Sequence, residues 1–237
     1  MQTTAVLLSG GLDSAVLVAE EATRGRVQPI YVSVGLAWEG AERRTIACLL
    51  ESGALGPNVQ PLAGLAVDMT DVYHPGHWAL DGRPPGYHTA DQEVYLPGRN
   101  IVLLSKAGVY CAMAHIGRLV VGTLAHNPFP DATTVFRSAM ATALSIGLEH
   151  ALQIEAPYAT VSKADVIRRG VALALPLELT LSCMNPALSA PPAPPRHCGV
   201  CSKCRERHDA FRDAGVPDPT VYANRRHIDM KSLKSET

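Results

Sequence analysis

The chain has 237 residues, of which 47% are hydrophobic and 18% charged, and its formal net charge is −1 at pH 7. This is enough apolar material for one α/β domain with an appended element, or for two small domains at most. A net charge near zero gives no electrostatic reason to expect a nucleic acid or a membrane as partner. Neither a membrane-spanning stretch nor a secretory signal is recognisable. We therefore expect a cytoplasmic protein whose six cysteines stay reduced.

Strand-like and helix-like segments alternate along most of the chain. The predicted strands are residues 4–8, 27–34, 60–69, 118–123 and 152–156. The predicted helices are residues 13–23, 39–51, 100–114, 133–148, 162–173 and 203–214. Such alternation favours a Rossmann-like α/β fold, a parallel sheet with helices on both faces. Residues 73–97 form a long irregular segment, and a loop of this length is typical of a functional or mobile element.

A glycine-rich segment joins the first predicted strand to the first predicted helix. It consists of Ser9, Gly10, Gly11, Leu12, Asp13 and Ser14. The two glycines allow positive φ and a close approach of backbone N–H groups to a ligand, and the following helix directs its positive end there. Asp13 can cap the helix or help to hold a metal ion on phosphate. This pattern resembles the PP-loop of ATP pyrophosphatases, which implies a grip on the β and γ phosphates of ATP. A capped helix after a tight turn is the simpler alternative.

Four cysteines towards the C-terminal end have the spacing of a metal site. They are Cys183, Cys198, Cys201 and Cys204, the last three in a C-x2-C-x2-C run. Four thiolates suit tetrahedral zinc in a structural role, because no coordination position remains open for a substrate. His197 could replace Cys183 as the fourth ligand, while an iron–sulfur cluster or a redox-active cysteine pair are the alternatives to zinc. Cys48 and Cys111 fall within predicted helices and are expected to be buried, inert thiols.

With these two motifs in place, the chain resembles the 7-cyano-7-deazaguanine synthase family of the queuosine precursor pathway, over roughly residues 3–214. Four segments carry the resemblance: residues 9–14, Pro97-Gly98-Arg99-Asn100, Ser162-Lys163-Ala164-Asp165, and residues 180–183 with the cysteine run. The resemblance implies adenylation of the carboxylate of 7-carboxy-7-deazaguanine, displacement of AMP by ammonia, and a second adenylation that leaves the nitrile. It also implies ATP as co-substrate, Mg²⁺, Zn²⁺ on the cysteines, and a homodimer.

The same resemblance suggests which residues carry the chemistry. The expected catalytic residues are Asp13, Ser14, Arg99 and Lys163. Arg99 and Lys163 are the cations that we expect on the phosphates. Outside the motif context they would be a surface arginine and a solvated lysine at a helix start.

One segment departs from the family pattern. After Gly122-Thr123 the family carries an acidic residue and then Ser-Gly-Tyr-Pro-Asp-Cys-Arg, which contacts the deazapurine, whereas residues 125–133 here are Ala-His-Asn-Pro-Phe-Pro-Asp-Ala-Thr. Phe129 could stack on a flat ring, and Asp131 could accept hydrogen bonds from a guanine-like edge. They could equally be a loop hydrophobe and a helix N-cap. This departure keeps open a related enzyme that uses a different carboxylate or stops at the amide.

Two more distant alternatives also remain. Other PP-loop proteins thiolate tRNA, but they often carry reactive cysteines on the sheet and an appended RNA-binding domain, and neither is evident here. A non-catalytic zinc interaction module would need a degenerate phosphate loop, whereas residues 9–14 are intact.

The composition changes at Pro176, which suggests how the chain is divided. Pro191, Pro192, Pro194 and Pro195 exclude a helix or a central strand just before the cysteine run. We expect a nucleotide-binding α/β domain over residues 1–175, a zinc-binding helical element over residues 176–216, and a partly disordered polar tail over residues 217–237.

Overall fold

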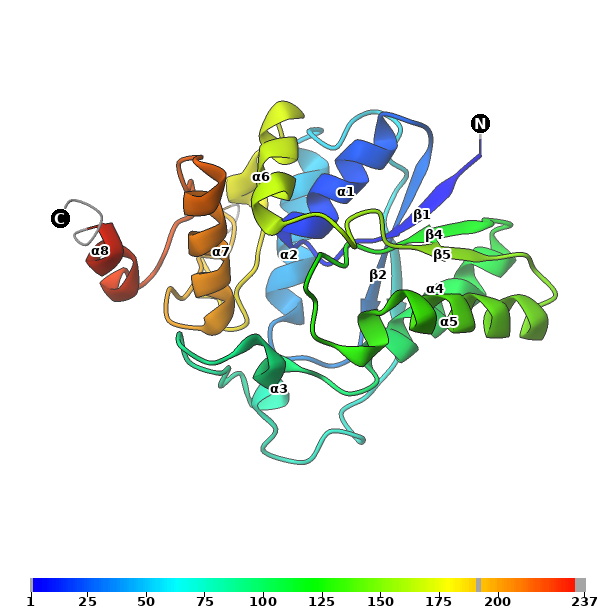
Figure 1. Cartoon of the computed structure of the whole chain (residues 1–237), viewed down its shortest axis with the longest axis horizontal. Helices are drawn as coiled ribbons and strands as arrows, with labels where there is room; N and C mark the ends of the chain where they lie inside the picture. Colours follow the sequence, from blue (N-terminus) through cyan, green and yellow to red (C-terminus); the bar gives the residue numbers. More distant parts are fainter. Residues whose placement is uncertain (1, 191–192, 233–237) are drawn as a thin grey trace.

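Five strands form one parallel sheet in the order β3-β2-β1-β4-β5 (Figure 1). They are β1 Thr4–Leu7, β2 Val27–Ser33, β3 Ala63–Ala66, β4 Arg118–Val120 and β5 Gln153–Glu155. The structure is a computed structural model that describes residues 2–190 and 193–232. Every predicted strand is confirmed with shorter bounds. β3, for example, keeps only the four residues that pair with β2, because an apolar run extends beyond the part that has a hydrogen-bonding neighbour.

The order of the strands decides where a ligand can bind. The chain leaves β1 towards β2 on one side, and β4 joins β1 on the other side, so the direction of winding reverses between β1 and β4. In open parallel sheets a crevice forms at this switch point, outside the carboxyl ends of the strands. The segments after Leu7 and after Val120 therefore lie next to each other at the edge where a ligand is expected.

Helices cover both faces of the sheet, as its almost continuous apolar strands require. Buried residues of α4 (Arg99–Met113) and partly buried residues of α5 (Thr134–Gly147) share one core with Ala5 and Ile30. The opposite core joins Val6 to residues of α1 Leu12–Ala22, α2 Glu39–Glu51, α6 Lys163–Ala172 and α7 Ser202–Ala214. Figure 1 shows the two layers on either side of the strands. The Rossmann-like α/β expectation is thus confirmed. No helix in the described ranges has the length and apolar character needed to cross a membrane.

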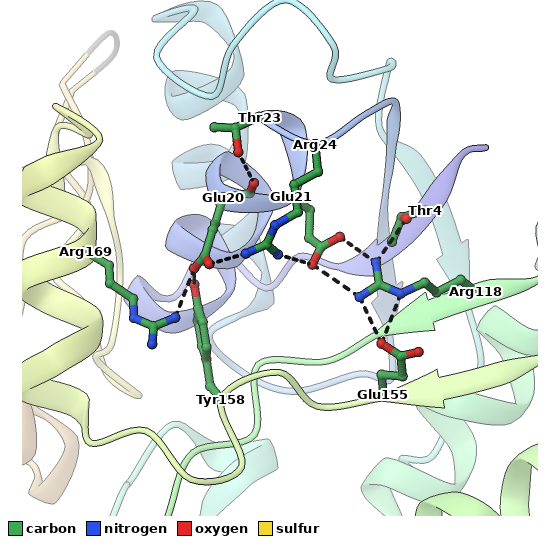
Figure 2. Close-up of polar contacts among 9 residues, drawn as sticks. All are labelled: Thr4, Glu20, Glu21, Thr23, Arg24, Arg118, Glu155, Tyr158 and Arg169. Atoms are coloured by element: carbon green, nitrogen blue, oxygen red, sulfur yellow. Dashed lines mark hydrogen bonds and ion pairs between the residues drawn. The ribbon is translucent and has the colours of Figure 1, made fainter. Parts of the chain in front are cut away.

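A polar network holds the far end of α1 against the strands (Figure 2). Arg118, at the start of β4, contacts the buried carboxylate of Glu21 on α1 and donates from Nε to Glu155 Oε2 at 3.0 Å. Tyr158 donates its hydroxyl to Glu20 Oε2 at 2.8 Å. Because Glu21 is only 3% exposed, its charge needs this partner. The network fixes α1 at its C-terminal end and so orients the N-terminus of the helix at the switch point.

The long segment 73–97 is not wholly irregular. It contains the short helix α3 Trp78–Asp81 and the 3₁₀ turn η1 Asp91–Val94. Arg205, on α7 (Ser202–Ala214), donates to the carbonyl oxygens of Tyr87 at 3.0 Å and Thr89 at 2.9 Å. Hydrogen bonds therefore hold the segment against α7, and the segment can form one wall of a site there.

The C-terminal part packs into the same cores as the sheet. Arg207 of α7 is fully buried and donates to Thr220 Oγ1 at 2.6 Å, Thr180 Oγ1 at 2.8 Å and the carbonyl oxygen of Leu177 at 2.8 Å. The cysteines and Phe211 belong to the two cores that also contain the strands. The division into residues 1–175 and 176–216 therefore does not coincide with separate cores, and it stays a prediction.

The polar tail over residues 217–237 stays a prediction, but its described part, residues 217–232, contributes two apolar side chains to the core. Tyr222 is 7% exposed and Ile228, on α8 (Arg226–Ser232), is 6% exposed, because both belong to the core cluster that includes the buried cysteines of the motif. The backbone N–H of His197 donates to the carbonyl of Val221 at 3.0 Å, so this segment pairs with the cysteine run. Residues 233–237, with Pro191 and Pro192, lie outside the described residues.

Candidate active site and metal centre

The glycine-rich loop after β1 is closed by its own serines. The N–H of Ser9 donates to Ser14 Oγ at 3.2 Å, and Ser14 Oγ donates to the carbonyl of Gly11 at 3.0 Å. Gly10 has φ +75°, a conformation that favours glycine. The first N–H groups of α1, which have no intrahelical acceptor, therefore face the switch point together with the positive end of the helix dipole. This arrangement suits an anion.

A group of four charged side chains lies beside this loop. Lys163, the first residue of α6, places Nζ 3.2 Å from Asp13 Oδ2 and 2.5 Å from Glu206 Oε1. Lys203 reaches the other oxygen of Glu206 at 2.6 Å. Burial opposes the charge on Lys163, yet the carboxylates of Asp13 and Glu206 raise its pKa. Burial also acts against ionised Glu206, but the two lysines lower the pKa of Glu206 to about 2. Both partners of this pair are therefore charged at neutral pH.

One carboxylate oxygen of Asp13 is available to a further partner. Burial raises the pKa of Asp13 above its usual range, against the attraction of Lys163. Its Oδ1 is buried and has no hydrogen-bond partner among the described residues. A buried oxygen without a partner is costly unless a ligand supplies one. This oxygen is a candidate ligand for a metal ion.

A cavity of about 360 Å³ unites most of the expected site residues. Its walls include Ser9, Gly11, Leu12, Asp13, Arg99, Phe129 and Lys163 from the sequence-based expectation. Among the wall residues that sequence reasoning missed are Trp38, Glu42, Trp78, Lys203 and Glu206. Lys203 and Glu206 carry a weak signal in their place within or just after the cysteine run. Trp38 caps the start of α2, Glu42 lies in its first turn and Trp78 begins α3, and their sequence pattern is that of ordinary helix residues.

Arg99 stands at the start of α4, after Gly98 with φ +77°. It lines the main cavity, and its buried Nε has no hydrogen-bond partner among the described residues. A guanidinium placed this way can donate hydrogen bonds to an anionic ligand in the cavity. It is not a surface arginine, because Nε is buried.

The altered segment 125–133 forms an adjoining cavity of about 250 Å³. Phe129 stacks on Tyr95 with ring centroids 5.0 Å apart. Asp131 is 6% exposed and accepts from the backbone N–H of Asn100 at 3.1 Å through Oδ2, while its buried Oδ1 has no partner in the described structure. The N-cap of α5 is Thr133, whose hydroxyl accepts from the N–H of Phe136 at 3.2 Å. The helix N-cap alternative for Asp131 is therefore wrong.

The four cysteines of the motif converge on one point. Their sulfur atoms all lie within 4.8 Å of one another, with Cys201 Sγ 3.5 Å from Cys204 Sγ and 3.9 Å from Cys183 Sγ. Tetrahedral zinc at a Zn–S distance of about 2.3 Å would separate its sulfurs by roughly 3.8 Å. Backbone N–H groups donate to these sulfurs, for example that of Cys198 to Cys183 at 3.2 Å. The cluster could therefore hold a metal ion.

His197 takes no part in this cluster. Its Nε2 accepts from the backbone N–H of Ser182 at 3.0 Å, and its ring packs edge-on against Tyr222. Burial lowers the pKa of His197, so the ring is neutral. Cys183 and not His197 completes the group of four candidate ligands. Cys111 is fully buried as expected, whereas Cys48 is half-buried.

Gly199 makes the turn of the cysteine run possible. It has φ +78°, and a Cβ there would lie 1.8 Å from the carbonyl oxygen of Asn224. Only glycine fits between the turn and the C-terminal segment that crosses it. The cysteine cluster and residues 221–224 thus hold each other in place.

The chain is similar to proteins of one family over most of its length. The family model described as "Queuosine biosynthesis protein QueC" matches residues 82–215. A protein of Methanopyrus kandleri named 7-cyano-7-deazaguanine synthase is 34% identical over 94% of this chain and 99% of its own length. One of the same name from Anaeromyxobacter dehalogenans is 34% identical over 92% of this chain and 94% of its own. Among solved structures, a protein described as a predicted subunit of tRNA methyltransferase from Methanocaldococcus jannaschii gives a TM-score of 0.47 at 13% identity, covering 95% of this chain and 94% of that one.

Proposed function

The chain belongs to the family described as Queuosine biosynthesis protein QueC, a family of enzymes, and on that premise we propose that it converts 7-carboxy-7-deazaguanine and ammonia to 7-cyano-7-deazaguanine. Each turnover would consume two ATP and release two AMP and two pyrophosphate. The single observation that carries the proposal is the shared cavity, whose lining includes residues of the glycine-rich loop, Arg99, Lys163 and Phe129 of the altered segment.

The loop and the cations account for the activation chemistry. A carboxylate oxygen is a poor leaving group until it becomes part of AMP, and pyrophosphate must be stabilised as it departs. The N-terminus of α1 and the serines of the loop would bind the β and γ phosphates. Lys163 and Arg99 would neutralise the charge that develops. Ser14 acts mainly by holding the loop in shape, because its hydroxyl is used within the loop.

Asp13 would hold Mg²⁺ through its unpartnered Oδ1, since carboxylate oxygens are the ligands that this ion prefers. When bound, the ion would help to neutralise the phosphates. Lys203 and Glu206 would complete the charge balance around Lys163, as the three side chains are already joined by ion pairs.

The cysteine cluster would hold Zn²⁺ in a structural role. The four sulfur donors and their spacing fit zinc, and they leave no open coordination position for chemistry. The cluster also lies at the N-terminal end of α7, the helix that supplies Lys203 and Glu206 to the cavity. Zinc would thus fix the position of two charged wall residues.

Phe129 and Asp131 would recognise the deazaguanine ring. The ring of Phe129 offers an apolar face beside the cavity, and the free Oδ1 of Asp131 can accept N–H groups from a guanine-like edge. An amidating enzyme with a different carboxylate substrate remains the second candidate, because the rest of the family's substrate segment is replaced here.

Asp131→Asn tests this recognition. The variant is expected to raise KM for the acid roughly ten- to hundredfold, the equivalent of one lost hydrogen bond to a charged group. KM for ATP should change far less. Steady-state kinetics would measure both constants, with the exposed Glu93→Gln as matched control. Equal KM values for wild type and D131N would remove Asp131 from the substrate site.

The decisive experiment measures pyrophosphate release from ATP with 7-carboxy-7-deazaguanine and ammonium, and identifies the product by mass spectrometry. A nitrile product is the expected result. An amide as end product would favour the relative that stops halfway. No turnover with this acid, in a protein that binds ATP, would reject the proposed substrate while leaving adenylation of another carboxylate.

We further propose a homodimer formed through α4 and α5. The exposed face of α5 is uncharged and carries Val135, 81% exposed, and Ile146, 74% exposed. On the neighbouring α4, Met113 is 79% exposed. Large exposed apolar side chains on an uncharged helix face are suited to an interaction site. We keep the cytoplasm as the proposed location, because thiols such as the four of the cysteine cluster stay reduced there.

The variant V135K/I146K is expected to turn the dimer into a monomer, because two buried lysines in an interface would lack partners. Light scattering coupled to gel filtration would give the mass of both proteins. Val171→Lys, on the exposed side of α6 and 50% exposed, serves as control. A wild type that is already monomeric would contradict the assignment.

A further inference from the structure

Glu42, on α2, is a buried carboxyl group in the wall of the main cavity. It is 8% exposed and lines the cavity with the phosphate loop and Arg99. Tyr31 donates its hydroxyl to Glu42 Oε2 at 2.8 Å, and the indole N–H of Trp38 donates to Oε1 at 3.1 Å. Each oxygen retains a second lone pair. Glu42 is therefore held rigidly by two neutral donors and can still accept a proton.

The other acidic residues of the cavity wall are differently placed. Asp13 and Glu206 are ion-paired with Lys163, and Glu206 with Lys203 as well. Asp91 is 46% exposed and paired with Arg205. A carboxylate that is stabilised by a lysine or arginine in direct contact is a weak base. Of the four acidic side chains lining the cavity, Glu42 is the one with no direct ion pair among the described residues.

The proposed reaction needs a base, because the nitrogen arrives as ammonia with three hydrogens and ends as a nitrile with none. When ammonia attacks the acyl adenylate, the C–N bond forms, the bond to AMP breaks, and the nitrogen loses one proton. When the amide oxygen attacks the α-phosphate and expels pyrophosphate, the nitrogen loses a second. The third leaves as the C–O bond to AMP breaks and the C≡N bond forms.

We propose that Glu42 is the general base that accepts these three protons in succession, passing each to solvent before it takes the next. This inference rests on the proposed function. It assigns a catalytic role to a residue outside the phosphate loop and outside the segment 125–133. The rigid hydrogen bonds from Tyr31 and Trp38 would keep the carboxylate aimed at the reacting nitrogen.

The pH dependence follows from the groups around Glu42. Burial raises the pKa of Glu42 to about 7, against the lowering effects of Arg99 on α4 and of the hydrogen bonds from Tyr31 on β2 and Trp38. Glu39 on the same helix raises it. Burial, Glu42 and Glu39 raise the pKa of Tyr31, so its hydroxyl stays protonated as a donor. Because a base acts only when deprotonated, kcat should rise with pH through about 7.

Glu42→Gln separates the base from a purely structural residue. We expect nitrile formation from the acid, and from the amide, to fall at least about 10²-fold. Exchange of labelled pyrophosphate into ATP with the acid and without ammonium releases no N–H proton, so it should fall far less. Exchange that drops as much as nitrile formation would show that Glu42 only maintains the site. If the wild type makes nitrile and E42Q matches it, the inference alone fails; if the wild type makes none, the proposed function fails first.

Tyr31→Phe gives a second test that does not remove the carboxyl group. Loss of the Tyr31 hydrogen bond should raise the pKa of Glu42, so the rising limb of the kcat profile should move to higher pH. E42Q should lack that limb. His126, which also lines the cavity, is the rival base. A limb that is unmoved in Y31F, or that disappears in His126→Ala, would overturn the assignment to Glu42.

Discussion

Asp13→Asn is expected to lower the rate of pyrophosphate release at least about 10²-fold, with little change in thermal stability. The substitution keeps the size of the side chain but removes the charge that faces Lys163 at 3.2 Å and the oxygen available to a metal ion. Removing one preorganised electrostatic group from an active site commonly costs 10²- to 10³-fold in rate. The measurement is acid-dependent pyrophosphate release at saturating ATP.

The matched control is Asp165→Asn, the same chemical change on α6. Asp165 is 53% exposed and pairs with Arg168 at the surface, so its loss should leave the rate within a few-fold of wild type. Equal rates for D13N and D165N would contradict the assignment of the loop. Ser14→Ala should also slow the reaction, since its hydroxyl closes the loop on Ser9 and Gly11.

Cys201→Ser is expected to abolish the proposed binding of zinc and to lower the free energy of unfolding by roughly 4 kcal/mol or more, the range typical of losing a structural metal. Cys201 is 2% exposed and lies within 3.9 Å of two other cluster sulfurs. Without the metal, the turn at Gly199 and the segment that crosses it lose their common anchor.

Metal analysis and thermal unfolding would measure the two effects, with Cys48→Ser, outside the cluster, as control. Zinc content unchanged in C201S would refute the ligand assignment. Iron in place of zinc in the wild type, with the visible absorption of a cluster, would correct the metal and leave the four ligands standing.

The phosphate loop and the cysteine run could be predicted from sequence because their geometry is local. A strand, two glycines and a helix start place Gly10 and Asp13 by backbone conformation alone. A C-x2-C spacing brings two sulfurs together within one turn. The alternation of apolar segments similarly indicated the parallel sheet, since strands buried on both faces must be apolar.

Residues 217–232 show where such reasoning ends. The segment is polar in sequence, yet Tyr222 and Ile228 are buried because the fold brings them against residues far away in the chain. Composition cannot reveal this, because two apolar side chains in a polar stretch become core only when a partner surface is present.

The amino-acid pattern alone was enough to predict the class of the fold, the glycine-rich turn between β1 and α1 and the gathering of four thiols. The packing of distant segments was needed to show that Glu42, Lys203 and Glu206 share the cavity with the loop, and that Asp131 is not a helix cap. These side chains come from α2 and α7, and their positions depend on how helices pack on a sheet. Local patterns follow from the backbone of a few residues, whereas a cavity wall is set by contacts between distant ones, which no spacing in the chain records.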